Sequence, residues 1–198
     1  MNKTDRLARI ISTLFVPPSF TIIVFTIFAF VLESYSLKRV ITIMVAFLFG
    51  FTAQIILFLL FRRKGKIIDL DASVKEERTT PFLISVGFYL AGLVILIIFR
   101  VHIISIAFWF CYISNTLVTI FINKHWKISA HAMGASGPLA AVTFVFGPVA
   151  LVFTLLVILI GWARVHLKVH NTAQVIAGIL FAFISTYLQI FLIVKWFN

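Results

Sequence analysis

Three short polar segments interrupt an otherwise apolar chain, and their residue types suit the binding and transfer of a phosphoryl group. The segments are Glu76–Phe82, Lys127–His131 and Ala163–Gln174. Arginine presents a rigid fork of donors that matches phosphate oxygens. Histidine can act as a nucleophile or as a general acid near neutral pH. The segments therefore predict an anion site with acid–base chemistry, and its candidate residues are Arg78, Lys127, His131, Arg164 and His170.

Each polar segment also carries a signal for the start of a helix. Thr80 before Pro81 fits an N-cap followed by the first helical residue. Ser129 fits the N-cap of a second helix, and Asn171 or Thr172 that of a third. The free N–H groups and partial positive charge of a helix N-terminus attract phosphate. Three such ends brought together would favour an anionic ligand.

The order and spacing of these residues resemble the type 2 phosphatidic acid phosphatase family. That family has three motifs: Lys-x6-Arg-Pro, Pro-Ser-Gly-His and Ser-Arg-x5-His-x3-Asp. The third matches best, with Arg164, His170 and Gln174 at the family spacing. The second matches as Ile128–His131, which contains Ser129.

The first motif is degenerate, and the resemblance covers about residues 62–190. Arg78 stands where the family has arginine, but the proline comes at Pro81. Asp71 stands seven residues before Arg78, where the family has lysine. The resemblance implies a helical core like that of the phosphatidic acid phosphatases and haloperoxidases.

The resemblance also implies a reaction, the hydrolysis of a lipid phosphate or diphosphate through a phosphohistidine, without metal or cofactor. In it His170 attacks phosphorus and His131 protonates the departing alkoxide. The groups that would hold the phosphoryl oxygens are Arg78, Arg164, Lys127 and Ser129. The implied substrate is a phospholipid or a polyprenyl phosphate.

Gln174 replaces the family aspartate, and three consequences stay open. A carboxylate orients the nucleophilic imidazole and stabilises its positive charge, whereas an amide does only the first. The enzyme could be slow, or it could borrow a carboxylate from Asp69, Asp71, Glu76 or Glu77. Alternatively, the protein binds an anionic phospholipid with little or no turnover.

Other assignments have less support from the sequence. His125 and His166 have no counterpart in the family and are expected to be structural. His166 and His170 lie four residues apart, a spacing that suits zinc on a helix, but a matching acidic residue is missing. A magnesium-dependent polyprenyl transferase could use Asp69 and Asp71, but it needs a second acidic cluster. A transporter is disfavoured because the apolar runs lack charges at their centres.

The composition of the chain indicates what kind of fold positions these residues. Of 198 residues, 62% are hydrophobic and 12% are charged, whereas soluble domains carry roughly 25% charged residues. The chain is therefore expected to be one all-α integral membrane domain, residues 1–198, with about seven spans, or six if two merge. The expected spans are Ile10–Leu32, Val40–Phe61, Pro81–Phe99, Ile103–Ile122, Ser129–Phe146, Pro148–Ala163 and Thr172–Val194.

Seven spans would put thirteen of the seventeen lysines and arginines on one face, together with all three polar segments. The positive-inside rule then places that face in the cytoplasm of a cell membrane, which we expect to be a bacterial inner membrane. The net charge of +11 is assigned to contacts with anionic membrane lipids rather than nucleic acid. The oligomeric state is left open.

The sequence also predicts local features of single helices and of the longest connection. Pro17 and Pro18 should kink the first span. The long connection Arg62–Thr80 carries apolar residues at roughly helical spacing between its charges, so we expect a short amphipathic helix on the membrane surface. The small residues Ala130, Gly134, Ala135 and Gly137 should allow close helix packing.

Overall fold

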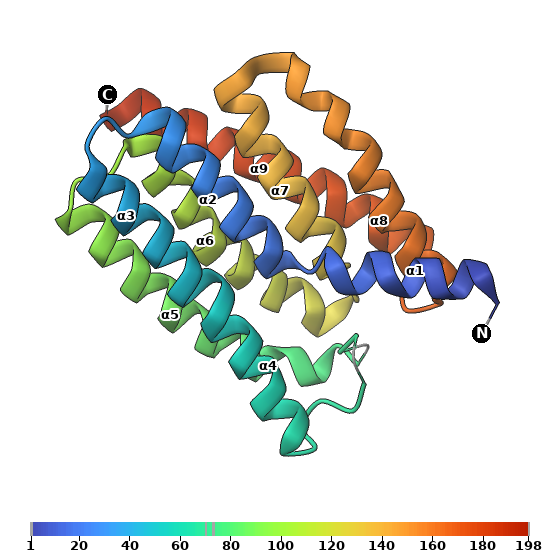
Figure 1. Ribbon diagram of the computed structural model, residues 1–198. Coiled ribbons are helices and arrows are strands. Elements are labelled where there is room, and N and C mark those ends of the chain that lie inside the picture. Colours follow the sequence, from blue (N-terminus) through green and yellow to red (C-terminus); the bar gives the residue numbers. More distant parts are fainter. Residues whose placement is uncertain (1, 70, 73, 198) are drawn as a thin grey trace.

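The chain folds into a bundle of helices in the computed structural model, which describes residues 2–69, 71–72 and 74–197 (Figure 1). Within these ranges there is no strand, in agreement with the all-α prediction. The helices and helical turns, in chain order, are α1 (Lys3–Leu14), α2 (Pro17–Leu32), α3 (Ser36–Val45), the π-helical η1 (Ala46–Thr52), α4 (Ala53–Arg63), the 3-10 turn η2 (Glu76–Arg78), α5 (Thr79–Ile98), α6 (Ile103–His125), α7 (Ala130–Phe146), the 3-10 segment η3 (Gly147–Phe153), α8 (Thr154–His166) and α9 (Thr172–Phe197).

The described part of the chain has five helical segments long and apolar enough to cross a membrane. It has up to six if α1 and α2, which are bent by 52° relative to each other, form one span. This architecture is consistent with a multi-pass membrane protein. The five segments are Ser36–Arg63, Glu76–Ile98, Ile103–His125, Ala130–His166 and Thr172–Phe197.

The segment Ala130–His166 reverses direction at η3, so that α7 and α8 lie side by side (Figure 1). The reversal begins at Gly147, whose φ of +75° is readily adopted only by glycine. Proline follows as Pro148. The sequence predicts that two adjacent spans meet at Gly147 and Pro148. The hairpin of α7 and α8 agrees with that prediction. The seven-span topology as a whole stays a prediction.

The kink expected in the first span is a complete break. α1 ends at Leu14 and α2 begins at Pro17, with Pro17 and Pro18 in its first turn. Proline has no N–H to continue a preceding helix, but its fixed φ suits a first turn. The segment Ile10–Leu32 is therefore not one straight helix, and α1 leaves the bundle to pack against α8.

The amphipathic helix expected over Arg62–Thr80 is wrong apart from the short turn η2. Ile67 is buried whereas Ile68 is 75% exposed, so the two do not share an apolar face. Gly65 and Ala72 have positive φ, and Asp69 Oδ1 accepts a hydrogen bond from the Asp71 backbone N–H. This local turn geometry competes with a helix. Leu70, one of the apolar residues expected on this helix, lies outside the described residues.

Two other expectations concern helix starts. Ser129 is the N-cap of α7 and accepts a hydrogen bond from the Ala132 N–H, as predicted. Asn171 Oδ1 likewise accepts from the Gln174 N–H at the start of α9, at 2.9 Å. The prediction for Thr80 is wrong, because α5 already begins at Thr79 directly after η2.

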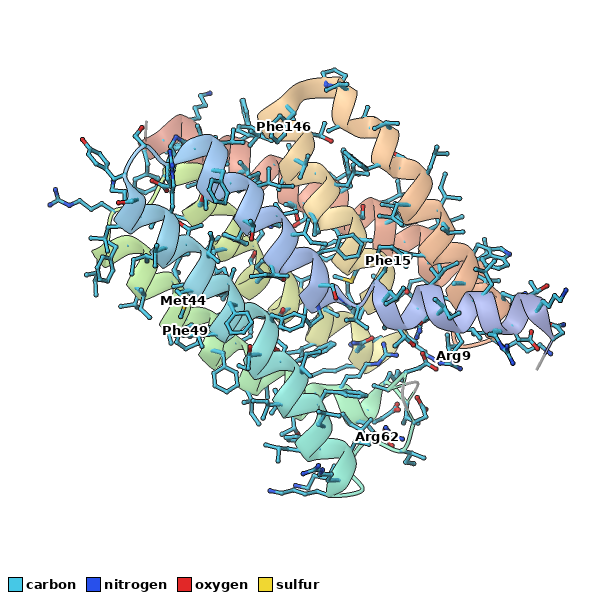
Figure 2. All side chains as sticks on the ribbon, in the orientation of Figure 1. Arg9, Phe15, Met44, Phe49, Arg62 and Phe146 are labelled. Carbon is cyan, nitrogen blue, oxygen red and sulfur yellow. The ribbon has the colours of Figure 1, made fainter. Side chains whose placement is uncertain are left out.

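Glycines allow several helices of the bundle to approach closely. A methyl group added at Gly134 of α7 would lie 2.5 Å from Cβ of Pro17 and 2.9 Å from its Cα. At Gly92 of α5, an added methyl would lie 2.5 Å from the ring of Trp109, which is fully buried in α6. The expected role of Gly134 in close packing agrees with this contact. Figure 2 shows the resulting bundle with Arg9 and Arg62 towards one end and Phe146 towards the other.

We predict that Gly134→Ala destabilises the protein by about 1–3 kcal/mol, because α2 and α7 would have to move apart. Gly87→Ala is the matched control. A methyl group there meets no other atom of the described chain within 4 Å, and alanine favours a helix. Thermal unfolding in detergent should show a lower Tm for Gly134→Ala alone. Equal Tm values would contradict the close packing of Pro17 on Gly134.

Candidate anion site

Contacts between distant segments gather the polar groups at one end of the bundle. Arg9 of α1 pairs with Asp71 of the connection between α4 and α5. Lys75 of the same connection donates to the Lys124 backbone oxygen at 3.2 Å. Lys127 donates to the Val169 backbone oxygen at 2.5 Å. The three polar segments found in the sequence, together with α1, therefore surround one region.

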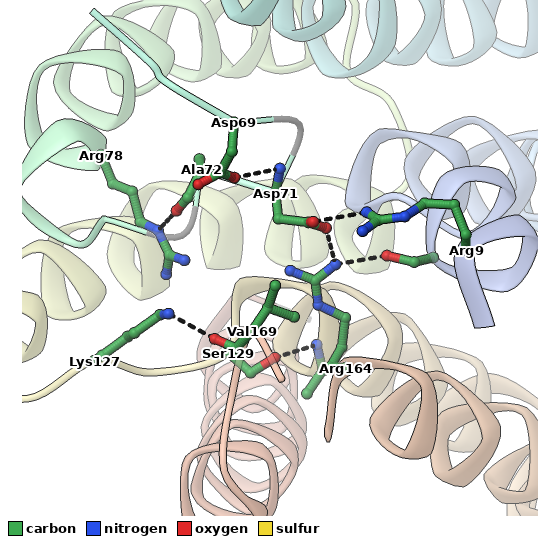
Figure 3. Close-up of polar contacts among 11 residues, drawn as sticks. Arg9, Asp69, Asp71, Ala72, Arg78, Lys127, Ser129, Arg164 and Val169 are labelled. Atoms are coloured by element: carbon green, nitrogen blue, oxygen red, sulfur yellow. Dashed lines mark hydrogen bonds and ion pairs between the residues drawn. The ribbon is translucent and has the colours of Figure 1, made fainter. Parts of the chain in front are cut away.

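Arg164 lies at the centre of this region, in the last turn of α8, and is fully buried. Its Nη1 donates to Ser12 Oγ and to Asp71 Oδ1, both at 2.5 Å (Figure 3). Its Nε and Nη2 have no hydrogen-bond partner within the described parts of the chain. An unsatisfied buried donor is destabilising, more so on a charged group. The N–H groups on these two nitrogens are suited to an anionic ligand.

Arg78 lies at the start of α5 and is 4% exposed. Its Nε donates to the Ala72 backbone oxygen at 2.6 Å, and its Nη1 donates to the Ile128 backbone oxygen at 3.1 Å. These bonds join the Asp71–Ala72 turn to the segment before α7. Arg78 is therefore fixed in position beside the connection that carries Asp71.

Three cationic groups face a shared space. Figure 3 shows the guanidinium groups of Arg78 and Arg164 and the ammonium group of Lys127 directed toward one another. Burial lowers the pKa of Lys127 from its usual value, and the charges of Arg78 and Arg164 lower it further. Mutual repulsion of this kind is relieved when an anion binds between the cations. Their arrangement favours a ligand with more than one negative oxygen.

The side chain of His170 is held by Gln174, which lies in the first turn of α9. The His170 Nδ1 lies 3.0 Å from Gln174 Oε1, and the same oxygen accepts from the Asn171 N–H at 3.3 Å. That second bond assigns Oε1 as an acceptor, so Nδ1 of His170 carries the proton and donates it. Nε2 then keeps a free lone pair. This is the tautomer that a nucleophilic imidazole requires.

The surroundings of His170 keep it neutral. Burial lowers its pKa to about 3, and the positive charges of Arg78, Lys127 and Arg164 act in the same direction, against the hydrogen bond that the imidazole donates to Gln174. The side chain is 6% exposed. At neutral pH the imidazole is therefore uncharged and able to share its electron pair.

Asp71, one of the carboxylates that the sequence offered as a substitute for the family aspartate, is engaged by two arginines. Asp71 pairs with Arg9 and Arg164, at 2.7 and 2.5 Å. Burial raises the pKa of Asp71, but its pairs with Arg9 and Arg164 outweigh burial and lower that pKa overall. Asp71 is therefore ionised and acts as a counterion.

A cavity of about 310 Å³ connects this polar end with the apolar interior. Asp71, Arg78, His131 and His170 line its polar end. The remainder runs between helices and is lined largely by apolar and aromatic side chains, among them Pro17, Phe58, Phe82, Phe108, Tyr112 and Ala182. A charged end on an apolar cavity fits an amphiphile with an anionic head.

All seven residues predicted from the sequence lie at this end of the bundle. Arg78, His131 and His170 line the cavity. The cationic ends of Arg164 and Lys127 are directed toward that of Arg78 (Figure 3), Ser129 caps α7, and Gln174 holds His170. His166 lies elsewhere, with Nε2 2.9 Å from Asp5 of α1. Groups of three or more His, Cys, Asp or Glu side chains able to hold a metal ion are not found among the described residues.

The sequence prediction missed Arg9, Ser12 and Asp71 as neighbours of Arg164. Arg9 and Ser12 lie three residues apart on α1, so they share a helix face, and that face also carries buried Ala8. This spacing was the available signal. It could not reveal which distant residue the face would meet.

Comparison of the chain with protein-family models, with curated proteins and with solved structures finds no match.

We predict that His170 makes the protein sensitive to acid. Its pKa is lower in the folded than in the unfolded chain, so the unfolded chain binds more protons as the pH falls below about 6.5, and stability decreases. Between pH 6.5 and 5 this contributes about 1–2 kcal/mol of lost stability. Thermal unfolding over this range should show a smaller loss for His170→Gln than for the wild type. Parallel curves would contradict a buried, neutral His170.

Proposed function

We propose that the protein is a metal-independent phosphatase that hydrolyses a lipid phosphate or diphosphate at the membrane surface. The main support for the proposal is Arg164, a fully buried guanidinium whose Nε and Nη2 have no hydrogen-bond partner among the described residues. It lies beside His170, which has a free Nε2. The adjoining apolar cavity supports a lipid as the substrate. The motif resemblance of Arg164, His170 and Gln174 supports the same reaction class.

In the proposed reaction, Nε2 of His170 attacks phosphorus while the bond from phosphorus to the lipid oxygen breaks. His131 donates a proton to the departing oxygen. The lipid leaves as an alcohol from a monophosphate, or as the lipid monophosphate from a diphosphate. Water then attacks the phosphohistidine, His131 takes a proton from it, and inorganic phosphate leaves. An incoming phosphate dianion next to His131 favours its protonated form, as the first step requires.

Arg164, Arg78 and Lys127 would hold the phosphoryl oxygens and stabilise their charge as it redistributes. Phosphoryl transfer is accelerated mainly by positioning and by positive charge, both of which three fixed cations supply. The Ser129 hydroxyl, at the N-terminus of α7, would add another polar contact. The substrate would be a phospholipid or a polyprenyl phosphate, with its chain in the apolar part of the cavity.

The membrane side is also part of the proposal. The polar end of the bundle contains α1, the 62–80 connection and the segments before α7 and α9, which together hold most of the basic residues. By the positive-inside rule this end would face the cytoplasm of a cell membrane, proposed to be a bacterial inner membrane. Anionic lipid head groups would lie at the same level.

The test is release of phosphate from a panel of lipid phosphates by the purified protein in detergent or vesicles. Wild type should release phosphate equally well with and without chelator. His170→Ala should reduce the rate by roughly 10^3-fold or more, because it removes the nucleophile. His125→Ala is the control, since His125 is exposed and its ring makes an edge-to-face contact with Phe121. Activity that survives His170→Ala would overturn the mechanism.

A specific observation favours a second function, binding of an anionic phospholipid with little turnover. The partner of His170 is the neutral amide of Gln174, which orients the ring but does not stabilise the positive charge that forms during attack. In serine proteases the change from carboxylate to amide at the equivalent position costs about 10^4 in rate. A phosphate-binding site would remain without efficient catalysis.

We predict that Gln174→Asp raises kcat by about 10-fold or more while the affinity for phosphate changes less, because a carboxylate stabilises the imidazolium. The measurement is steady-state phosphate release, with Gln174→Glu as a variant that restores charge at a different length. An unchanged kcat in Gln174→Asp would show that the amide does not limit turnover.

A further inference from the structure

The described residues hold the guanidinium of Arg164 from one side. Both contacts of its guanidinium use Nη1, which meets Ser12 Oγ and Asp71 Oδ1 at 2.5 Å. Because the guanidinium is planar and rigid, holding Nη1 also fixes the directions of Nε and Nη2. Those two are the N–H groups without a partner in the described ranges. The groups around Nη1 therefore determine where Arg164 presents its free donors.

One of these groups belongs to α1. Ser12 is 3% exposed and lies with Ala8 and Ile11 on the buried face of that helix. α1 packs against α8, which carries Arg164, so the two helices bring Ser12 to Nη1 directly. The contact joins residues 152 positions apart in the chain.

α1 also controls the charge beside Arg164. Asp71 would neutralise Arg164 if it were the only partner, but its other oxygen accepts from Arg9 Nη1 at 2.7 Å (Figure 3). Two arginines and one carboxylate leave one net positive charge. Without Arg9 that charge would be cancelled, and an incoming phosphate would meet an unshared carboxylate next to its arginine.

We propose that α1 is a component of the anion site, with Ser12 and Arg9 as positioning residues for Arg164. This rests on the proposed function, and it assigns to a helix outside the motif-bearing region a part in binding the phosphoryl group. Ser12 orients the guanidinium. Arg9 holds Asp71 so that the positive charge of Arg164 stays available to phosphate oxygens.

Other contacts keep α1 in place when either residue is changed. Asp5 pairs with His166 at 2.9 Å, near the C-terminal end of α8. Ala8 and Ile11 pack in a buried cluster with Val157, Ile160 and Ala163. Single changes at Ser12 or Arg9 are therefore expected to alter the anion site without detaching the helix.

The experiment measures the affinity for inorganic phosphate by calorimetry in detergent, and the kcat and KM for a short-chain phosphatidic acid. The variants are Ser12→Ala, Arg9→Gln and Arg9→Lys. Thr13→Ala and Arg6→Gln are matched controls on the exposed side of α1. We expect about tenfold weaker phosphate binding for Ser12→Ala and Arg9→Gln, with a rise in KM larger than any fall in kcat. Arg9→Lys should recover most of the affinity because it keeps the charge.

Three results would overturn the inference. Wild-type affinity in both Ser12→Ala and Arg9→Gln would remove α1 from the site while leaving the proposed function intact. A loss of affinity equal in the variants and their controls, with a lower Tm in the absence of phosphate, would mean that α1 acts only on stability. If the wild type neither binds nor releases phosphate, the proposed function and this inference fail together.

Discussion

The buried guanidinium of Arg164 is the constraint on which the polar end of this bundle depends. Moving a charge out of water is strongly unfavourable unless it is paired and hydrogen-bonded. Asp71 supplies the pair and Ser12 a hydrogen bond, yet both meet Nη1, and the donors Nε and Nη2 remain without a partner in the described chain. A hydrophobic residue of similar size would avoid this cost. An anionic ligand would satisfy the free donors and gives a reason to keep the arginine.

The surrounding helices and loops hold the guanidinium of Arg164 in place. α8 ends in the turn that carries Arg164, and α9 begins where Asn171 caps its first turn and Gln174 holds His170. The connection after α4 folds back so that Asp71 reaches the arginine. The short loop between α8 and α9 therefore keeps His170, the candidate nucleophile, close to Arg164. Helix packing, including the close approach at Gly134, brings in the other walls of the cavity.

Local patterns in the sequence were enough to predict much of this site. The spacing of Arg164, His170 and Gln174 fixes their relation because a single helix end and loop connect them. The caps at Ser129 and Asn171 are also local, since each uses a backbone N–H three residues away. Apolar runs of sufficient length predicted most of the long helices.

Predictions failed where distant parts of the chain decide the outcome. The 62–80 connection has helical spacing of its apolar residues, but its turn is set by Asp69 and by the long-range pairs of Asp71. The kink at Pro17 and Pro18 was predicted, but the sequence did not indicate that the break leaves α1 to pack on α8. The contacts of Arg9 and Ser12 with the site follow from that packing, and a pattern within one segment does not encode them.

The most direct test of the account is an experimental structure of the protein with orthovanadate, an analogue of a phosphoryl group in transfer. We expect vanadate to lie between Arg164, Arg78 and Lys127, with its oxygens on Nε and Nη2 of Arg164 and its vanadium next to Nε2 of His170. Vanadate bound elsewhere, or an Arg164 whose free donors stay unpaired at saturating vanadate, would contradict it.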